Sequence, residues 1–241
     1  MAHKKATHLS RLAAPGSWPI ERKKTKWIMK PKPGTLSLQM GMPISVYLTD
    51  ILKFTRNKSE AKKVLNQGLV LVNGKAVKEP GYQTGLFDTI TVQKYNKTYR
   101  VVLDNLGRLK LTEIPAKEST LVPVKVRGKT SIKAGKLQIN LSNGWNFISE
   151  KDSYKVNDVL IFDAKEKKAV KHLKLEKGNL IYITKGAHSG TIATIKDFVQ
   201  EGVLRKKKYI VASANDEKLK VLVDGVFVIG KDDPEITVKW Q

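Results

Sequence analysis

The stretch from Leu52 to Lys78 constrains the fold most strongly, because its turn residues dictate their own geometry. Asn73-Gly74 is the pair most typical of a two-residue β-hairpin, since both central positions of a type I′ turn need positive φ. We therefore expect a strand at 69–72, and a returning strand at 75–77. This hairpin anchors the prediction for the residues around it.

Two short helices joined by a basic turn are predicted before the hairpin. The second helix runs from Glu60 to Gln67, with Ser59 as its expected N-cap and Gly68 as its left-handed terminator. Pro43 suits the first turn of the earlier helix, which ends at Phe54. Its apolar residues recur at helical spacing: Ile44, Tyr47, Leu48, Ile51 and Leu52.

Cations gather on one side of this unit. Val64 and Leu65 are expected to point into a core, and Glu60 is the one acidic residue on the opposite side. The cations expected to project from that opposite side are Arg56, Lys58, Lys62, Lys63 and Lys75. The pattern predicts a compact scaffold with one cationic face.

The net charge of the chain is too large for solubility alone to explain. Its 241 residues carry 45 Lys and Arg against 22 Asp and Glu, a net charge of +23, of which +8 lies in residues 1–42. A merely Lys-rich soluble surface rarely needs such an imbalance, so we expect a polyanionic partner. A membrane-surface role is disfavoured because no basic amphipathic helix with aromatic residues on its apolar face is visible.

The composition also limits which cellular compartment and which kinds of metal site we expect. The chain has no cysteine, which excludes disulfides and Cys-type metal sites and fits a reducing compartment. No apolar run approaches the ~20 residues of a membrane span, and the N-terminus lacks the apolar core of a signal peptide. We therefore expect a cytoplasmic protein without a membrane partner.

Residues 1–42 have the composition of a basic extended arm. Proline and glycine punctuate any helix or strand there, and Trp18 and Trp27 either stack on bases or pin the arm to the protein body. We expect the arm to order only on binding and to neutralise phosphates along its path. Its candidate binding residues are Arg22, Lys23, Lys24, Lys26, Lys30 and Lys32.

Beyond the arm, short strands predominate, so the fold class is α+β and mostly β, with several domains. Residues 43–104 read as a small α+β module, 105–175 as a central β-barrel-like domain, and 176–241 as a further small barrel. In the last region, the glycine-bounded loop from Lys185 to Gly190 separates two strands, and a run of four cations spans 205–208.

The sequence lacks the common catalytic and metal-binding motifs. There is no phosphate-binding glycine loop and no G-x-S-x-G motif. The histidines are dispersed rather than paired at metal spacing: His3, His8, His172 and His188. The sequence predicts neither an enzyme nor a protein with a cofactor, a metal or a small-molecule substrate.

Three stretches carry a resemblance to known families. The segment from Thr55 to Leu65, followed by Gly68 to Lys75, resembles the alpha-L RNA-binding motif, and Lys185 to Gly190 is similar to a KOW motif. The third stretch has the N-terminal segments Leu12-Ala13-Ala14-Pro15, Trp18-Pro19-Ile20-Glu21-Arg22-Lys23, Lys26-Trp27 and Lys30-Pro31-Lys32-Pro33-Gly34. These segments resemble the start of the ribosomal protein S4e family, which belongs to the small subunit of archaea and eukaryotes.

The resemblance covers essentially the whole chain, and its length looks archaeal. It implies a structural constituent of the small ribosomal subunit that binds rRNA beside neighbouring ribosomal proteins in the cytoplasm. It also implies an alpha-L module at 43–104 and an SH3-like KOW barrel at 176–241 whose loop touches RNA through Lys185. Two alternatives stay open: an RNA-modifying enzyme that docks through the alpha-L module, and a KOW-type transcription elongation factor.

Overall fold

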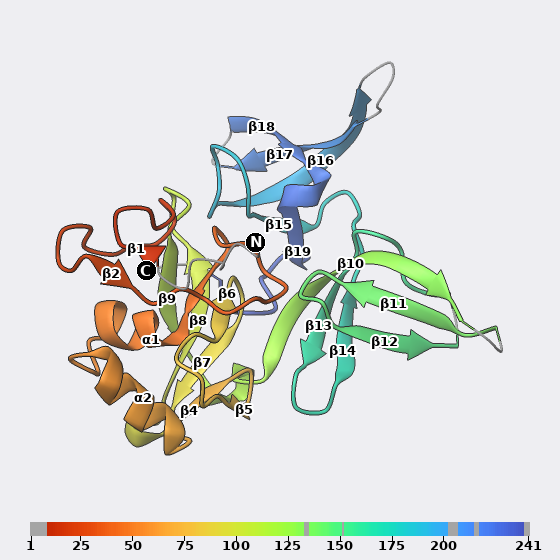
Figure 1. Ribbon diagram of the computed structural model, residues 1–241. Helices are drawn as coiled ribbons and strands as arrows, with labels where there is room; N and C mark the ends of the chain where they lie inside the picture. Colours follow the sequence, from red (N-terminus) through yellow and green to blue (C-terminus); the bar gives the residue numbers. More distant parts are fainter. Residues whose placement is uncertain (1–8, 133–134, 151, 202–206, 215–216, 239–241) are drawn as a thin grey trace, which may run out of the picture. The chain divides into compact units, whose positions relative to one another are not determined.

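The computed structural model describes residues 9–132, 135–150, 152–201, 207–214 and 217–238, and it divides into two compact units (Figure 1). The first unit comprises Met1–Val102 with Arg108–Ser119, and the second comprises Leu103–Gly107 with Thr120–Gln241. In the described part of the chain, no helix is long and apolar enough to cross a membrane.

The first unit is built on a five-stranded antiparallel sheet in the order β5-β4-β7-β8-β9. Its strands and two short 3-10 turns are β4 (Val70–Val72), β5 (Lys75–Ala76), β7 (Thr89–Val92), η2 (Gln93–Tyr95), β8 (Lys97–Leu103), β9 (Leu109–Ile114) and η3 (Ala116–Glu118). The sheet extends beyond the expected module boundary at 104, because β9 is its last strand. Strand β7 begins only at Thr89, since Phe87 has a positive φ of 70° and lies in a turn.

Two helical segments pack beside this sheet. The first is shorter than expected: α1 (Ile44–Val46) continues into a π-helical turn η1 (Tyr47–Ile51), and Lys53 then takes a positive φ of 53°. The second is α2 (Lys58–Asn66), which ends before Gly68 at φ 74°. The side chains buried here include Ile44, Tyr47, Leu48, Ala61 and Leu65, whereas Ile51, Leu52 and Val64 are only half-buried.

The N-terminal segment does not match the prediction. From residue 9 onward it is folded against the rest of the first unit, so the expectation of an extended arm that orders only on binding is wrong for the described residues. Its strands are β1 (Leu9–Ser10) paired with β2 (Trp27–Ile28), and β3 (Gly41–Pro43) paired with β6 (Gln83–Gly85).

Trp18 supplies the physical reason. It is only 2% exposed, and its indole Nε1 donates a hydrogen bond of 3.0 Å to the Leu38 carbonyl. Burial of one large aromatic side chain contributes roughly 2–3 kcal/mol, enough to hold a short segment in place. Trp18 therefore pins the segment, whereas Trp27 remains 52% exposed.

The second unit contains two five-stranded antiparallel sheets. The first has the order β12-β11-β10-β13-β14, and the second has the order β18-β17-β16-β15-β19. Their elements are β10 (Leu121–Ser131), β11 (Leu137–Leu141), β12 (Asn146–Ser149), β13 (Val159–Asp163), β14 (Lys168–Leu173), β15 (Leu180–Ile183), β16 (Ile192–Glu201), β17 (Lys207–Ala214), β18 (Glu217–Leu222), the 3-10 turn η5 (Val223–Gly225) and β19 (Val226–Gly230). A turn at Asn143-Gly144 joins β11 to β12, with Gly144 at φ 81°.

A buried lysine links parts of the second unit that are far apart in sequence. Lys125 on β10 is 5% exposed, and its Nζ donates hydrogen bonds to the carbonyls of Val223, at 2.6 Å, and Val226, at 3.0 Å. Burial lowers the pKa of Lys125 from its ordinary value of 10.5 to about 8. The apolar core around this region is formed mainly by β15–β19, with Ile181, Ile183 and Ile210 fully buried.

Candidate nucleic-acid interface

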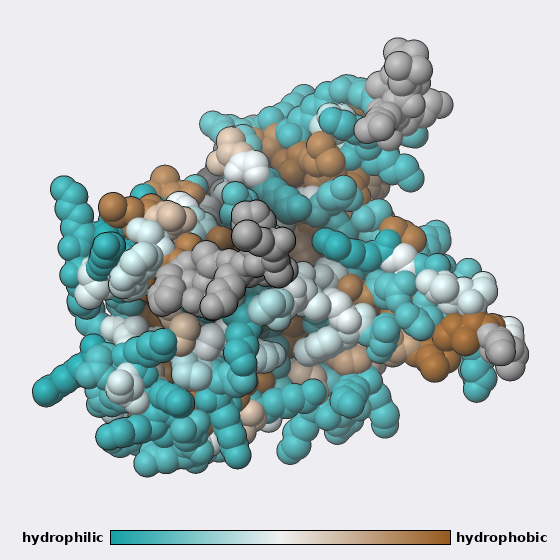
Figure 2. All heavy atoms as spheres, viewed as in Figure 1, coloured by the Kyte–Doolittle hydropathy of each residue, from teal (hydrophilic) through white to brown (hydrophobic). Residues whose placement is uncertain are grey.

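Helix α2 separates apolar and cationic residues onto opposite sides. Ala61 and Leu65 are fully buried, whereas Lys58, Lys62 and Lys63 are exposed. Lys58 and Lys62 are four residues apart and so lie on the same face of the helix. Figure 2 shows hydrophilic side chains covering the surface over α2, at the lower left.

The N-terminus of α2 is capped by Asn57 and not by the expected Ser59. The Asn57 side chain accepts a hydrogen bond of 2.9 Å from the backbone N–H of Glu60. The Glu60 carboxylate in turn accepts one of 2.7 Å from the backbone N–H of Arg56. The acidic residue of this face is thus engaged with the backbone of the basic turn, which it fixes in place.

The hairpin after α2 has the predicted geometry. Asn73 and Gly74 have φ values of 50° and 75°, as a type I′ turn requires. Beside the turn, Lys75 on β5 is exposed to solvent. The local sequence therefore places the Lys75 side chain at the surface, as predicted.

A groove of about 660 Å³ unites cations that are distant in sequence. Five of the predicted binding residues line it: Lys24, Lys26 and Lys30 from the N-terminal segment, and Arg56 and Lys58 from the turn and the start of α2. Trp27 also lines the groove, and Lys26 Nζ lies 5.2 Å from the centre of its ring. This site exists only because the N-terminal segment is folded.

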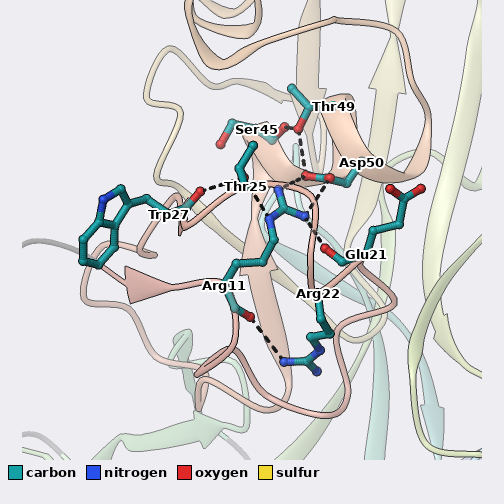
Figure 3. A network of polar contacts seen from close by, with 8 residues as sticks. All are labelled: Arg11, Glu21, Arg22, Thr25, Trp27, Ser45, Thr49 and Asp50. Carbon is teal, nitrogen blue, oxygen red and sulfur yellow. Dashed lines mark hydrogen bonds and ion pairs between the residues drawn. The ribbon is translucent and has the colours of Figure 1, made fainter.

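An ion pair holds the two sides of this groove together (Figure 3). Arg11 donates to both carboxylate oxygens of Asp50, at 3.0 and 3.3 Å, and its Nε donates to Thr25 Oγ1 at 3.1 Å. The Arg11 and Asp50 side chains are only 6% and 9% exposed. A bidentate pair of this kind fixes orientation as well as distance.

Other predicted residues lie elsewhere or are already engaged. Arg22 donates to the backbone carbonyls of Ala14 and Pro15, so its guanidinium braces the N-terminal segment. Lys32 forms an ion pair with Glu79, and Lys23 is exposed outside the groove lining. Lys185 is exposed in the second unit.

The loop from Lys185 to Gly190 owes its shape to close backbone packing. Gly190 has φ 87°, and a Cβ there would lie 2.4 Å from the Asp104 carbonyl oxygen. Within this loop Ser189 is buried, while Lys185 and His188 are exposed. Two residues of the predicted cation run, Arg205 and Lys206, lie outside the described residues.

Sequence reasoning missed Asn57 as a cap and Ser45 as a member of the groove, whereas it named Trp27 as a residue that either stacks on bases or pins the arm. Asn57 could have been found, because Asn followed three residues later by Glu is a capping signature. Ser45 carries no such signal, since its place in the groove depends on tertiary folding. In the part of the chain that the structure describes, no group of His, Asp and Glu could hold a metal ion.

Three family models match the chain. They are the RS4NT (NUC023) domain at residues 3–35, the S4 domain at 42–90, and Ribosomal family S4e at 95–169. The S4 domain match spans α1, α2 and the Asn73-Gly74 hairpin, where the cationic face lies.

Similar proteins cover nearly the whole chain. Small ribosomal subunit protein eS4 of Methanocella arvoryzae is 39% identical over 95% of this chain and 96% of its own length. The eS4 protein of Methanosphaera stadtmanae is 39% identical over 96% of this chain and 95% of its own length. A crystal structure of the 30S ribosomal protein S4e from Thermoplasma acidophilum matches with a TM-score of 0.68 and 29% identity, covering 80% of this chain and 96% of that one. The chain belongs to the S4e family of small ribosomal subunit proteins.

Proposed function

We propose that this protein is a structural constituent of the small ribosomal subunit in the cytoplasm and binds rRNA there. The observation that carries the proposal is the exposed cationic face of α2 and its hairpin, where the Glu60 carboxylate is engaged by the Arg56 backbone. The names of the archaeal relatives and the S4 domain match support it.

In this proposal the cations act on phosphates and set the position of the protein. Each lysine or arginine that meets a phosphate releases a counterion, so binding is tight at modest salt and falls steeply as salt rises. Folded rRNA is then recognised by its shape and backbone rather than by a base sequence. The residues assigned to this face are Arg56, Lys58, Lys62, Lys63 and Lys75.

The finer architecture belongs to the same proposal. We assign the α2–hairpin unit as an alpha-L RNA-binding module, 105–175 as a central β domain, and 176–241 as an SH3-like KOW barrel. Two observations support the barrel: the five-stranded sheet β18-β17-β16-β15-β19, and the tight loop that Gly190 closes against the backbone of Asp104. In the KOW barrel, Lys185 is the residue that meets RNA, and neighbouring ribosomal proteins are the expected protein partners.

Charge reversal tests the assigned face. Lys62→Glu with Lys63→Glu should weaken binding to small-subunit rRNA and flatten its salt dependence by about one unit of log–log slope for each phosphate that is no longer neutralised. The matched control is Lys165→Glu with Lys167→Glu, which changes the same charge in the exposed turn between β13 and β14. Equal losses for both pairs in a filter-binding titration would contradict the assignment.

Sedimentation tests the proposal as a whole. In a sucrose gradient of cell lysate, the protein should travel with the small subunit until high salt removes it. Recovery only at the top of the gradient would overturn the ribosomal role. Co-sedimentation with RNA polymerase would favour the elongation-factor alternative, and uridine modification by the purified chain would favour the RNA-modifying alternative.

A further inference from the structure

The groove between the N-terminal segment and the start of α2 combines three features: a cationic rim, an exposed indole and a buried hydroxyl. We propose that it binds one or two unpaired nucleotides of the RNA, with a base against Trp27 and the adjoining phosphates on the surrounding cations. This inference rests on the proposed rRNA binding and adds a site that reads single-stranded RNA. It follows from how the groove is lined.

Trp27 supplies a stacking surface. It lies on β2 next to Ile28, which is buried and anchors the strand, yet its own side chain is 52% exposed. In Figure 3 the indole points away from the Arg11–Asp50 pair, toward the outside of the network. Unstacked bases bind such aromatic faces whatever their identity, because every base has a π face.

Ser45 supplies a polar partner inside the groove. Its side chain is buried, with the residue 3% exposed, and its Oγ has no hydrogen-bond partner among the described residues. The Ser45 carbonyl already accepts from Thr49 Oγ1 at 2.9 Å, so the hydroxyl is the group left for a ligand. A base edge carries both donors and acceptors and can satisfy it, since a hydroxyl can act in either role.

The charges around the groove favour phosphates on both sides. Lys24, Lys26 and Lys30 line one side, and Arg56 and Lys58 line the other. Among the described residues that line the groove, Asp50 is the one with a carboxylate, and Arg11 neutralises it by the bidentate pair. The opening therefore stays positive although it contains an acidic residue.

The size of the groove suits a short, unpaired stretch of RNA. A volume of about 660 Å³ falls in the range of roughly 300–1,000 Å³ that small-molecule sites occupy. Half-buried Met29 and buried Ile28 and Val46 add apolar lining, which suits the face of a base better than a hydrated backbone. One or two nucleotides, extruded from paired RNA, fit this description.

The experiment compares two fluorescent probes of equal charge on the full-length chain. One is a single-stranded hexauridylate, and the other is a hexamer of the same sugar-phosphate backbone without bases. We expect the uridylate to bind on the order of tenfold more tightly, and Trp27→Ala to abolish that preference. Ser45→Ala should reduce it, while Phe198→Ala, which removes an exposed aromatic ring on β16, should leave it unchanged.

The outcomes separate this inference from the proposed function. Equal binding of the two probes, no binding of either, or a preference that survives Trp27→Ala would each overturn the nucleotide site. Titration of small-subunit rRNA against the wild type and the Lys62/Lys63 reversal reports on the proposed function independently. Because Trp27 is exposed, its truncation should leave the thermal unfolding midpoint nearly unchanged, which circular dichroism checks.

Discussion

The side-chain amide of Asn73 donates a hydrogen bond of 2.7 Å to the carboxyl group of half-buried Asp88. The Asn73 Oδ1 accepts from the backbone N–H of Thr89 at 2.8 Å, and the Gly85 N–H donates to the second Asp88 oxygen at 2.7 Å. One residue therefore forms the type I′ turn and also fastens it to the next strand. The turn that positions Lys75 is therefore stabilised by these side-chain hydrogen bonds as well as by the backbone preferences of Asn73 and Gly74.

Asn73→Gly separates the two roles, because glycine keeps the positive φ and removes the hydrogen bonds. We expect a loss of about 2–3 kcal/mol in the free energy of unfolding, since Asp88 loses a donor and Thr89 loses an acceptor. The control is Asn96→Gly, at the same φ of 50° but with an exposed side chain. Urea denaturation that gives equal, small losses for both variants would contradict the second role.

The Asp88 carboxyl makes stability depend on pH. Burial raises its pKa from 3.8 to about 6, despite hydrogen bonds from Asn73 and Gly85 that lower it. The folded state therefore binds more protons than the unfolded state between these values, and stability falls as the pH rises through about 6. The expected loss is about 3 kcal/mol between pH 3.5 and 7. Denaturation of the wild type and Asp88→Asn across that range should show the loss in the wild type alone, and parallel curves would refute it.

Lys125 gives a dependence of the opposite sign at alkaline pH. Because burial lowers its pKa to about 8, the unfolded state holds more protons between pH 8 and 10.5, and stability rises with pH through that window. The neutral amine still donates to the Val223 and Val226 carbonyls. Between pH 7.5 and 9.5, we expect the free energy of unfolding of the wild type to rise by about 2 kcal/mol relative to that of Lys125→Met. Urea denaturation of both proteins across this range measures the difference. A constant difference between the two proteins would show that the amine stays charged throughout.

Two glycines of the Lys185–Gly190 loop should respond differently to alanine. Gly186 has φ 99° but open space around its Cα, so Gly186→Ala should cost about 1–2 kcal/mol for its backbone conformation alone. Gly190→Ala adds a Cβ at 2.4 Å from the Asp104 carbonyl oxygen, and the loop must move. We expect a loss at least about 1 kcal/mol larger than for Gly186→Ala. Chemical denaturation of both variants checks the ranking, and a reversed order would place the strain elsewhere.

The Arg11–Asp50 pair should behave as a buried ion pair. Arg11→Met leaves the Asp50 carboxylate buried without its cation, at a cost of about 3–5 kcal/mol. The double variant Arg11→Met with Asp50→Leu removes both charges and should regain more than half of that loss. Limited proteolysis in the N-terminal segment should accelerate in the single variant and slow again in the double. Additive losses would mean that the two side chains are not coupled.

Local sequence was sufficient where a residue's own backbone preference decides the structure. Asn73-Gly74 and Gly68 were predicted correctly because positive φ is a property of the residue. The cationic side of α2 was predicted by placing Val64 and Leu65 toward a core; Leu65 is fully buried as predicted, whereas Val64 is only half-buried and Ala61 takes the second buried position. The predicted exposure of Lys62 and Lys63 needed no knowledge of the remaining chain.

Prediction failed where two distant segments meet. Nothing near Trp18 in the sequence reveals that its indole reaches the Leu38 carbonyl, so the N-terminal segment was expected to be extended. The groove depends on the pairing of Arg11 with Asp50, 39 residues apart. Its lysines were all candidates, but the sequence could not show which of them share one site.

The sheet of the first unit also determines where a fragment of the chain can end without exposing a strand edge. Strand β9 (Leu109–Ile114) lies beside β8 in that sheet, although the chain leaves the unit between the two strands. A fragment ending at residue 104 would expose the hydrogen-bonding edge of β8, and open edges of this kind recruit strands from other molecules. During synthesis, the first unit likewise cannot complete its sheet until residue 114 has left the ribosome that makes it. The S4-domain portion of this protein therefore matures only after the ribosome has begun to synthesise the second unit.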